Sequence, residues 1–379
     1  MNIAYVSNVV YPFVKGGAEK RIYEEGTRLV KRGHSVTVYG RHFWDGPKEQ
    51  EFDGLTLRAV SPERELYAGD RRSIGEAVEF SKDLLRPLQR HRREHDVVVA
   101  SVFPYLPVLT AGLVTGIART PLVTIWHEVW GPYWNEYLGA MGPAGRAVEL
   151  CVTRVPQYPV AVSGVTADRL AGIGPARESI AVVPNGIDAD RIGAVEPVST
   201  GFDVLFVGRL IEEKNVDALL QAFDVVAAEF DCRLGIVGDG PARETLERTA
   251  EDLHHRDRVS FLGFLDDYDE VLAQMRAATV FASPSRREGF GITLVEAMAA
   301  DCTVVAVRHP QSAAEEVVGD AGFLTEPTVT ALVGGLRSAL QGERPQTQPT
   351  VAAKRYDWDR IAEQSERVYA HAVASYGST

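Results

Sequence analysis

The sequence predicts an α/β protein with two domains, each built on a doubly wound parallel sheet with helices on both faces. A chain of 379 residues is too long for one ordinary hydrophobic core. Short apolar runs alternate with helical segments along nearly the whole chain, a pattern typical of parallel sheets. The alternation lapses at residues 192–201, which are rich in glycine, proline, serine and threonine. We therefore expect one domain over residues 1–190 and a second over residues 191–357.

In the first domain, apolar runs predict strands at residues 3–6, 36–39, 55–59, 97–100, 122–125, 160–162 and 180–183. Helical spacing of apolar residues predicts helices at residues 18–31, 74–91 and 108–118. Pro87 lies inside the second of these segments, so we expect that helix to bend or break there.

In the second domain, the same reasoning predicts strands at residues 204–207, 234–237, 259–261, 280–282 and 304–307. Helices are expected at residues 216–230, 242–253, 268–276, 292–299 and 313–318, followed by a final amphipathic helix at residues 358–372. Two successive open α/β domains usually bind a ligand at the carboxyl ends of their strands.

One apolar stretch is long enough to cross a membrane. Residues 97–118 hold no charged side chain over 22 positions. They include Pro104 and Pro107, and two prolines three residues apart break a helix. We therefore expect a buried strand, a proline loop and a buried helix here instead of a membrane span.

The charge is unevenly distributed along the chain. Residues 1–190 hold 22 Lys+Arg and 22 Asp+Glu, so the remaining 18 and 30 of the totals of 40 and 52 lie in residues 191–379. The net charge of −12 thus belongs entirely to the second half. Nucleic acid is not expected as a partner, because its phosphates require a basic face. Anionic lipid is compatible with the neutral first half only.

The cysteines and the N-terminus indicate the compartment. Cys151, Cys232 and Cys302 lie far apart, with no metal-ligand spacing. This pattern favours a reducing compartment, the cytoplasm, and no structural zinc. The first residues lack the basic and apolar regions of a signal peptide, so we expect them to form the first strand.

A glycine-rich turn with two glutamates carries the first functional signal. Glu288 follows a predicted strand, Gly289 and Gly291 allow close approach of the backbone to a ligand, and a helix is expected to begin near Ile292. Amide groups at that helix start could bind an anion or sugar hydroxyls. Glu288 and Glu296 are candidate acceptors for sugar and ribose hydroxyls, although a loop acid and a solvated helical glutamate would have the same sequence.

Two cations follow the first strand of the second domain. Arg209 and Lys214 lie in a loop before a helix for which Asn215 is the expected cap. In an acidic half of the chain they are the positive charges best placed for a diphosphate. Surface ion pairing with Glu212 or Glu213 is the alternative.

Three further glycine turns are weaker signals. Gly16 and Gly17 open the first helix, where they permit close approach to a phosphate or sugar but do not form a dinucleotide fingerprint. The turns at residues 238–241 and 185–188 are each explained by a structural turn alone.

Taken together and in this order, these segments resemble the GT-B glycosyltransferases of the family-4 type. The resemblance spans nearly the whole chain and rests on residues 16–19, 183–188, 207–210 with Lys214, 238–241, 261–264 and the pair Glu288 and Glu296. The combination is specific, although no single segment is. In one departure, residues 308–311 read Arg-His-Pro-Gln where the family often has two glycines. The family's contacts from that loop are therefore in doubt, and Arg308 adds a charge.

The resemblance implies two sheet domains that face each other across a cleft, with residues 358–379 packing back onto the first, acceptor-side domain. The second domain would bind a nucleotide sugar carrying UDP, GDP or ADP. Arg209 and Lys214 would hold its diphosphate in place of a metal ion, so no metal or other cofactor is expected. Glu288 would contact the sugar and Glu296 the ribose. Further donor contacts are implied at Gly16, Gly17, Gly263, Phe264, Phe290, Gly291, Ile292 and Thr293.

The resemblance also implies a mechanism. His127 follows the predicted strand at residues 122–125, and although a lone histidine there is more often structural, the family has one near the reacting sugar carbon. Hexosyl transfer would proceed with retention, the leaving diphosphate oxygen taking the acceptor proton. Charge stabilisation by Arg209 and Lys214 would supply most of the catalysis. A glycosidase-type carboxylate pair is not expected beside two phosphate-binding cations.

The acceptor is left open by the sequence. Three of the five tryptophans fall within nine residues, in a cluster that forms a core corner, a sugar-stacking wall or an interfacial patch: Trp126, Trp130, Tyr133, Trp134 and Tyr137. Cations recur at helical spacing at Lys82, Arg86, Arg90 and Arg93, where a solvated face is the favoured explanation. Both a soluble sugar or glycan and a lipid-linked acceptor are compatible with these features. The lipid-linked case includes peripheral contact of the first domain with the cytoplasmic membrane face.

Two other functions are considered. A sugar-nucleotide epimerase of the same architecture would act on the donor without an acceptor, and would carry extra acids near the sugar carbon. A non-catalytic sugar-nucleotide-binding protein would not need an intact set of Arg209, Lys214, Glu288 and His127, which argues against it.

Overall fold

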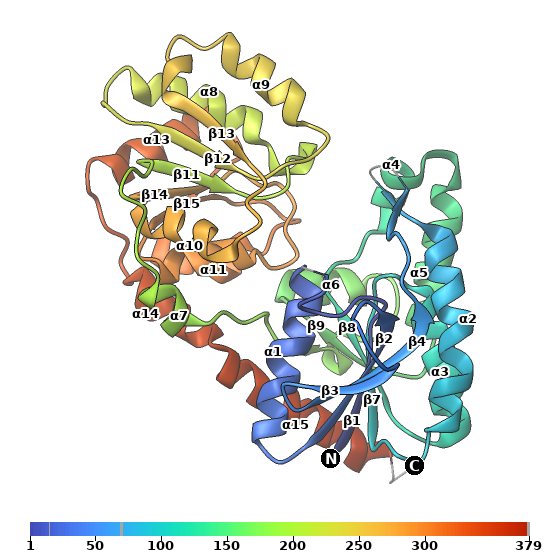
Figure 1. Ribbon diagram of the computed structural model, residues 1–379. Helices are drawn as coiled ribbons and strands as arrows, with labels where there is room; N and C mark the ends of the chain where they lie inside the picture. The colour runs from blue at the N-terminus through green and yellow to red at the C-terminus, as the bar shows by residue number, and fades with distance from the viewer. Residues whose placement is uncertain (15, 69–70, 377–379) are drawn as a thin grey trace. The chain divides into compact units, whose positions relative to one another are not determined.

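The computed structural model describes residues 1–14, 16–68 and 71–376, and the chain divides into two compact units. The first unit comprises residues 1–185 and the C-terminal segment that begins at Trp358, and the second comprises residues 186–357. Each unit has its own mainly parallel sheet covered by helices (Figure 1). The predicted α/β class with two parallel-sheet domains is confirmed.

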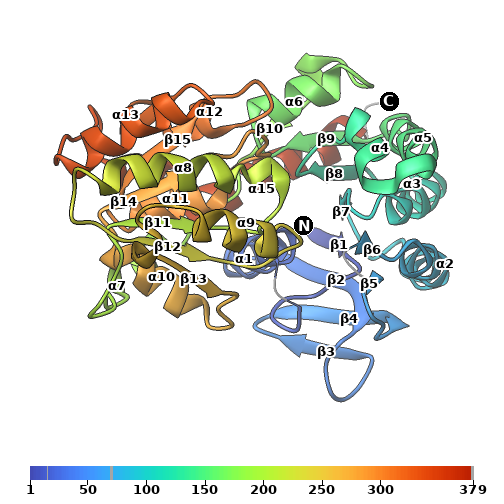
Figure 2. The ribbon, with the colours of Figure 1, turned by 90° about the horizontal axis from the view of Figure 1, so that it is seen from above.

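The first unit is built on an eight-stranded sheet in the order β10-β9-β8-β7-β1-β2-β4-β3. All neighbouring strands are parallel except β3 and β4, which form an antiparallel hairpin at one edge (Figure 2). The strands are β1 (Asn2–Val6), β2 (Ser35–His42), β3 (Glu49–Phe52), β4 (Leu55–Pro62), β7 (Val97–Ser101), β8 (Leu122–Trp126), β9 (Tyr158–Ala161) and β10 (Ala181–Val182). A separate two-stranded ribbon consists of β5 (Tyr67–Ala68) and β6 (Arg71–Arg72).

Helices cover both faces of this sheet. The helices are α1 (Gly17–Lys31), α2 (Ile74–Arg90), α3 (Leu106–Ala118), α4 (Trp134–Leu138), α5 (Gly142–Thr153), α6 (Gly164–Ala171) and α15 (Trp358–Tyr376). Figure 1 shows α1 and α15 on one face and α2 and α3 on the other. Because both faces are covered, every residue of β7 and of β8 is buried, which explains their continuous apolar sequences.

A buried polar cluster joins α15 to α1 and β1. The Glu25 carboxylate pairs with Arg21 at 2.6 Å and accepts hydrogen bonds from the hydroxyls of Tyr5 and Tyr369, both at 3.2 Å. Arg21, Glu25 and both tyrosines are buried, so the two opposite charges compensate each other inside the unit. The last helix is thereby part of the first unit's core.

The second unit is built on a six-stranded, fully parallel sheet in the order β13-β12-β11-β14-β15-β16. Its strands are β11 (Val204–Val207), β12 (Leu234–Val237), β13 (Val259–Gly263), β14 (Val280–Ser283), β15 (Thr303–Val307) and β16 (Gly322–Thr325). Its helices are α7 (Ala189–Ala194), α8 (Val216–Ala227), α9 (Arg243–Glu251), α10 (Tyr268–Ala277), α11 (Ile292–Ala299), α12 (Ala314–Val318), α13 (Val329–Leu340) and α14 (Pro349–Ala353). Figure 1 shows α8, α9 and α13 on one face of this sheet and α10 and α11 on the other.

Several elements differ from the sequence-based expectations. Pro87 lies within α2, which continues to Arg90 and does not break. The expected linker at residues 192–201 is partly helical, because Asp188 caps α7 by accepting a hydrogen bond from the Arg191 amide at 2.9 Å. Among the elements that the sequence analysis missed are β3, β16, α5, α6 and α13. An Asp53-Gly54 turn with positive φ at both residues joins β3 to β4, and Asp-Gly is a hairpin signal that would have found it.

The apolar stretch at residues 97–118 forms β7, a loop and α3, as expected. Within the described ranges, no helix combines the length and the apolar character needed to cross a membrane.

Candidate active site

The predicted donor residues lie at the carboxyl edge of the second unit's sheet. Arg209 and Lys214 follow β11, the glycine turn at residues 238–241 follows β12, and Glu288 follows β14. In this sheet β11 lies between β12 and β14. The loops after the three strands therefore meet at one edge, which is where ligands bind in open α/β sheets.

Two of these loops are packed against each other through their backbones. The amide of Gly208 donates to the Val237 carbonyl at 3.0 Å, and that of Leu210 to the Asp239 carbonyl at 2.9 Å. Gly238 has φ 133°, and a Cβ there would lie 2.0 Å from the Gly208 carbonyl oxygen. The glycine turn is thus needed for backbone packing, which supports its structural interpretation and fixes the main chain on both sides of Arg209.

Lys214 and Glu288, two of the predicted catalytic residues, form an ion pair with each other. Both side chains are largely buried, at 19% and 18% exposure. The alternative that Lys214 pairs with Glu212 or Glu213 is not what the structure contains. Because an ammonium group has three donors, Lys214 can hold Glu288 and a phosphate oxygen at the same time.

Asn215 has a different role from the one expected. Asn215 has φ 54°, and its side chain makes no capping hydrogen bond to α8. The side-chain amide Nδ2 instead donates to the Pro284 carbonyl at 3.3 Å. The predicted cap is therefore wrong. The left-handed backbone, which asparagine tolerates, ends the short helix Glu212–Lys214, and the side chain ties this loop to the chain after β14.

The backbone of Glu288 is held by the loop in which this chain departs from the family pattern. The Glu288 amide donates to the Gln311 carbonyl at 3.1 Å, and the Glu288 carbonyl accepts from Ala313 at 2.9 Å. The added charge of Arg308 is directed elsewhere, to Glu315 at 3.0 Å and Glu326 at 3.9 Å. Loop 308–311 thus positions Glu288 through main-chain bonds.

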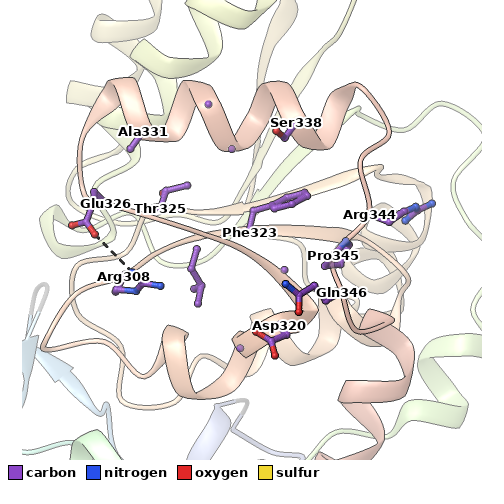
Figure 3. A pocket seen from close by; sticks show the side chains of 15 residues that line it. Arg308, Asp320, Phe323, Thr325, Glu326, Ala331, Ser338, Arg344, Pro345 and Gln346 are labelled. Carbon is purple, nitrogen blue, oxygen red and sulfur yellow. Dashed lines mark ion pairs between the residues drawn. The ribbon is translucent and has the colours of Figure 1, made fainter.

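Arg308 lines a polar cavity of about 620 Å³. Figure 3 shows this cavity between the edge strand β16, helix α13 and the loop that carries Arg344, with Arg308 paired to Glu326 at one end. The walls carry both cationic and acidic side chains, so the cavity has no excess of charge that would favour a diphosphate.

The helix start after Glu288 has the geometry of a backbone anion site. Gly291 has φ 83° at the N-terminal cap of α11, a conformation that favours glycine. Phe290 is buried and packs edge-on against Tyr356, with ring centroids 5.3 Å apart. Ile292 and Thr293 are half-buried at the first turn. The first amides of a helix have no partner within it and attract anionic or hydroxyl ligands.

Glu296 is 3% exposed, so the alternative of a solvated helical glutamate is excluded. Its Oε1 accepts a hydrogen bond from the hydroxyl of Tyr268, the first residue of α10. The sequence analysis missed Tyr268, because nothing in its spacing links it to Glu296. A carboxylate accepts several hydrogen bonds, so this contact leaves capacity for a ligand's hydroxyls.

The segment expected to meet the base lies at the end of β13. Gly263 has φ 73° and its carbonyl accepts from the Gly238 amide at 2.8 Å, which brings this segment beside the glycine turn. Phe264 is 66% exposed. An aromatic ring that is this exposed at a strand end is available to stack on a planar ligand.

In the first unit, His127 follows β8 and is partly buried. Burial, with a smaller contribution from the charge of Arg21, lowers the pKa of His127 to about 3. The imidazole is therefore neutral at physiological pH. A neutral ring presents one donor and one acceptor, and suits contact with sugar hydroxyls better than proton donation.

Gly16 and Gly17 open α1 as expected, with Gly16 as the N-terminal cap residue. A Cβ at Gly16 would lie 2.3 Å from Oε2 of Glu19, so a larger residue here would require the Glu19 side chain to shift. Burial raises the pKa of Glu19, and Arg72, 3.8 Å away, opposes this rise. The first glycine of the turn thus packs directly against a buried carboxylate.

The aromatic cluster is organised by a carboxylate that the sequence analysis did not single out. Glu149 on α5 is buried and accepts hydrogen bonds from the Tyr105 hydroxyl at 3.0 Å and the Trp134 indole at 3.2 Å. It also accepts from the amides of Trp130 and Gly131, at 2.8 and 2.9 Å. Trp126 and Trp134 are buried, so these tryptophans form a core corner and not an interfacial patch.

Across the part of the chain that the structure describes, no three histidine, cysteine, aspartate or glutamate side chains come together in a way that could hold a metal ion.

Two family models match the chain in succession. Residues 15–191 match Glycosyltransferase Family 4, and residues 191–356 match Glycosyl transferases group 1. Among curated proteins, a phosphatidyl-myo-inositol mannosyltransferase of Mycobacterium leprae is 35% identical over 212 residues, covering 52% of this chain and 54% of the relative. The match thus spans about half the length of that relative.

Solved structures share the fold over the whole chain. The sucrose-phosphate synthase of Thermosynechococcus elongatus superposes with a TM-score of 0.78 at 17% identity, covering 99% of each chain. HepE from Anabaena, solved in complex with UDP, gives a TM-score of 0.73 at 21% identity and covers 98% of this chain and 100% of HepE. At such identities the likeness establishes a common fold, with two parallel-sheet α/β domains.

Proposed function

This chain belongs to the GT-B glycosyltransferases of the family-4 type, and we propose that it transfers a hexosyl unit from a nucleotide-diphosphate sugar to an acceptor hydroxyl. In this proposal the reaction needs no metal ion and retains the anomeric configuration. The donor carries UDP, GDP or ADP. HepE, which was solved with UDP, has the same fold, which supports a nucleotide donor.

The observation that carries the proposal is the ion pair of Lys214 and Glu288. It joins a cation from the loop after β11 to an acid that lies just before the helix start at Gly291. Sugar and diphosphate are adjacent in a nucleotide sugar, so a diphosphate-binding cation and a sugar-binding acid should lie side by side. A pair whose role was only structural would not need the nearby anion-binding helix start.

In the proposed reaction, charge develops on the β-phosphate oxygen as the bond to the sugar carbon breaks. Arg209, Lys214 and the amides at residues 290–293 would stabilise that charge, and the same phosphate oxygen would take the proton from the acceptor hydroxyl. Each preorganised contact of this kind typically contributes about 2–4 kcal/mol to transition-state stabilisation.

The other predicted residues have matching roles in this proposal. Glu296 would bind the ribose hydroxyls, with Tyr268 fixing the direction of its carboxylate. Gly263 and Phe264 would meet the base. Neutral His127 would bind a hydroxyl or the ring oxygen of the reacting sugar without exchanging a proton, which agrees with its depressed pKa.

The proposal also includes peripheral contact of the first unit with an anionic membrane, through helix α2. Lys82, Arg86 and Arg90 are exposed along one helix, α2, in the half of the chain with no net charge. Each such cation near an anionic surface contributes about 1 kcal/mol to attraction. The mycobacterial relative is named for a lipid acceptor, which supports this possibility. Sedimentation with anionic and with neutral vesicles tests it.

One assay tests the function. The protein is incubated with UDP-, GDP- and ADP-sugars, with sugar and lipid-linked acceptors, and with EDTA. We expect acceptor-dependent release of one nucleoside diphosphate that persists in EDTA. An epimerised sugar without an acceptor would instead identify an epimerase, and tight binding with no turnover would identify a non-catalytic binding protein.

A further inference from the structure

A cavity of about 180 Å³ opens in the first unit beside the aromatic cluster. Its walls come from the start of α2, the loop between β7 and α3, and helices α4 and α5. The lining residues that carry the argument are Phe103, Leu106, Trp134, Tyr137, Leu138 and Val148. The loop after β7 is at the carboxyl edge of the sheet, where a parallel α/β domain binds its ligand.

The polar ends of the aromatic walls already have partners. The Tyr105 hydroxyl and the Trp134 indole donate to Glu149, and the Tyr137 hydroxyl accepts from the Arg72 amide at 2.8 Å. These bonds hold the rings in place and direct their polar atoms into the wall. Two further polar residues of the lining are engaged as well: Ser73 accepts from the Glu76 amide at 3.3 Å, and Arg72 pairs with Glu19 at 3.8 Å. What the rings present to the cavity is carbon, so a polar occupant would lose hydrogen bonds to water with little replacement. The lining therefore favours an apolar ligand.

The size of the cavity and the residues at its mouth favour a hydrocarbon chain as the ligand over a compact apolar group. An apolar protein cavity of about 150 Å³ is known to stay dry and to take up benzene, so 180 Å³ accommodates a short run of hydrocarbon. The apolar surface does not end at the mouth, because the lining residues Ile74 and Met141 are 48% and 55% exposed. A chain that extends past the mouth would cover both side chains.

The cavity lies beside the loop that follows β8, because Trp130 of that loop contacts two of the lining residues. Trp130 follows His127 by three residues, so their Cα atoms are at most about 11 Å apart. The Trp130 ring contacts Tyr137 and Trp134, with centroids 4.7 Å apart in both cases, and both of these residues line the cavity. A molecule with a hydroxyl near His127 and a tail of ordinary length can therefore reach the cavity.

We propose that this cavity binds the aliphatic chain of an amphiphilic acceptor whose hydroxyl end lies at His127. The proposal rests on the proposed glycosyltransferase function and names its acceptor class. It assigns to α2, α4 and α5 a part in acceptor selection, through apolar contacts alone.

A chain-length series tests the proposal by direct binding. Titration calorimetry with alkyl glucosides, from methyl to decyl and below their micelle concentrations, should give affinities that rise roughly three- to fourfold per methylene until the cavity is filled. Affinity that is independent of chain length would overturn the proposal.

Two matched variants locate the binding. Ala144 and Ala147 are both exposed on α5, but only Ala144 is among the described residues that line the cavity. Ala144→Trp should weaken decyl glucoside binding at least tenfold, whereas Ala147→Trp should leave it unchanged. Both variants should keep the wild-type thermal midpoint and nucleotide affinity. Equal effects of the two tryptophans would contradict the proposal.

The same variants separate this inference from the function on which it rests. Chain-length-dependent binding without sugar transfer to any acceptor would leave the pocket assignment standing and refute the glycosyltransferase. Sugar transfer whose rate depends neither on the chain length of the acceptor nor on Ala144→Trp would support the glycosyltransferase and refute the pocket assignment. A change of oligomeric state in Ala144→Trp, with alkyl binding unaffected, would instead identify the face as a contact between copies and overturn the proposal.

Discussion

The carboxyl edges of the two sheets are built from the same topology but offer opposite chemistry. In the second unit, the loops after β11 and β14 bring together Arg209, the ion pair of Lys214 with Glu288, and the start of α11. In the first unit, the loops after β7 and β8 bring together aromatic rings around a buried Glu149 and a neutral His127. The edge of the second unit thus offers charges and hydrogen-bonding groups, whereas the edge of the first unit offers mostly apolar ring surface.

This difference shows that the backbone topology specifies where a ligand binds, while the loops specify which ligand. It also runs against the overall charge, because the unit with the two candidate phosphate-binding cations belongs to the acidic half of the chain. In a half with a net charge of −12, two cations placed at the strand ends are a specific feature, because random placement would favour acidic side chains there. In the neutral half, by contrast, the buried carboxylate of Glu149 holds aromatic residues in place.

The largest expected effect comes from the charged edge. Lys214→Met should lower turnover by roughly a hundredfold or more, because it removes a preorganised contact to the leaving diphosphate worth about 2–4 kcal/mol. Lys354→Met, at an exposed lysine of the same unit, is the control and should change nothing. The test is to compare the steady-state turnover rates of the two variants with that of the wild type. Equal activity in the two would remove Lys214 from the mechanism.

The next effect is on the stability of the aromatic edge. Glu149→Gln replaces one carboxylate oxygen by an amide donor. That donor would face either the Tyr105 hydroxyl and the Trp130 amide, or the Gly131 amide and the Trp134 indole. We expect a loss of about 2 kcal/mol in the free energy of unfolding, measured by urea denaturation. Glu136→Gln, at an exposed residue of α4, should cost almost nothing. If the two variants were equally stable, Glu149 would not organise the cluster.

Glu288→Gln should separate binding from turnover. Removing the carboxylate charge frees Lys214 for the diphosphate, so nucleoside diphosphate affinity should rise a few-fold. Turnover should fall at least tenfold, because the sugar loses its charged acceptor. Calorimetry and steady-state kinetics on the same preparation give both values. Weaker nucleotide binding in this variant would mean that Glu288 does not compete for Lys214.

A smaller effect is expected at Tyr268. Tyr268→Phe removes the hydroxyl that orients Glu296, so KM for the donor should rise roughly three- to tenfold with little change in kcat. A nucleotide without 2′ and 3′ hydroxyls should bind to the variant and the wild type equally, because Glu296 has nothing to accept from it. A loss of affinity for that nucleotide as well would indicate general damage to the site.

The last effect concerns pH and is absent near neutrality. The pKa of His127 is about 3 in the folded chain and about 6.5 when unfolded, so between these values the unfolded chain binds a proton that the folded chain does not. His127 therefore lowers the free energy of unfolding as pH falls from 6.5 towards 3. His127→Gln should reduce this slope. The remaining slope comes from His95, whose pKa burial lowers to about 4, and from carboxylates whose pKa hydrogen bonds and ion pairs lower, such as Glu366. An unchanged slope would show that His127 is not neutral in the folded protein.

The sequence was a good guide to the fold because buried parallel strands leave a simple signal. β7 and β8 are covered on both faces, so their apolar runs could be recognised directly. β16 is a short, half-buried edge strand with no comparable run, and α13 contains Gly334 and Gly335, so both were missed. Polar β3 depends on its turn and on pairing with β4, which periodicity does not report.

The sequence indicated which residues belong to the candidate site, but not which of them contact each other. Spacing pointed to Lys214 and Glu288 separately, and only the neighbouring positions of β11 and β14 in the sheet explain why they meet. Glu149 and Tyr268 act on residues 15 and 28 positions away. Contacts over such separations are set by packing and leave no local pattern. Asn215 was misjudged because its backbone is left-handed, a conformation in which its side chain leaves the helix start.

The most direct test is the affinity and turnover of the double variant Arg209→Ala/Lys214→Ala, beside the wild type, both in excess EDTA. We predict that the wild type keeps full activity, and that the double variant loses at least a hundredfold in nucleoside diphosphate affinity together with its turnover. A double variant that still binds and turns over as the wild type does, or a wild type that is inactive until divalent ions are restored, would contradict the account.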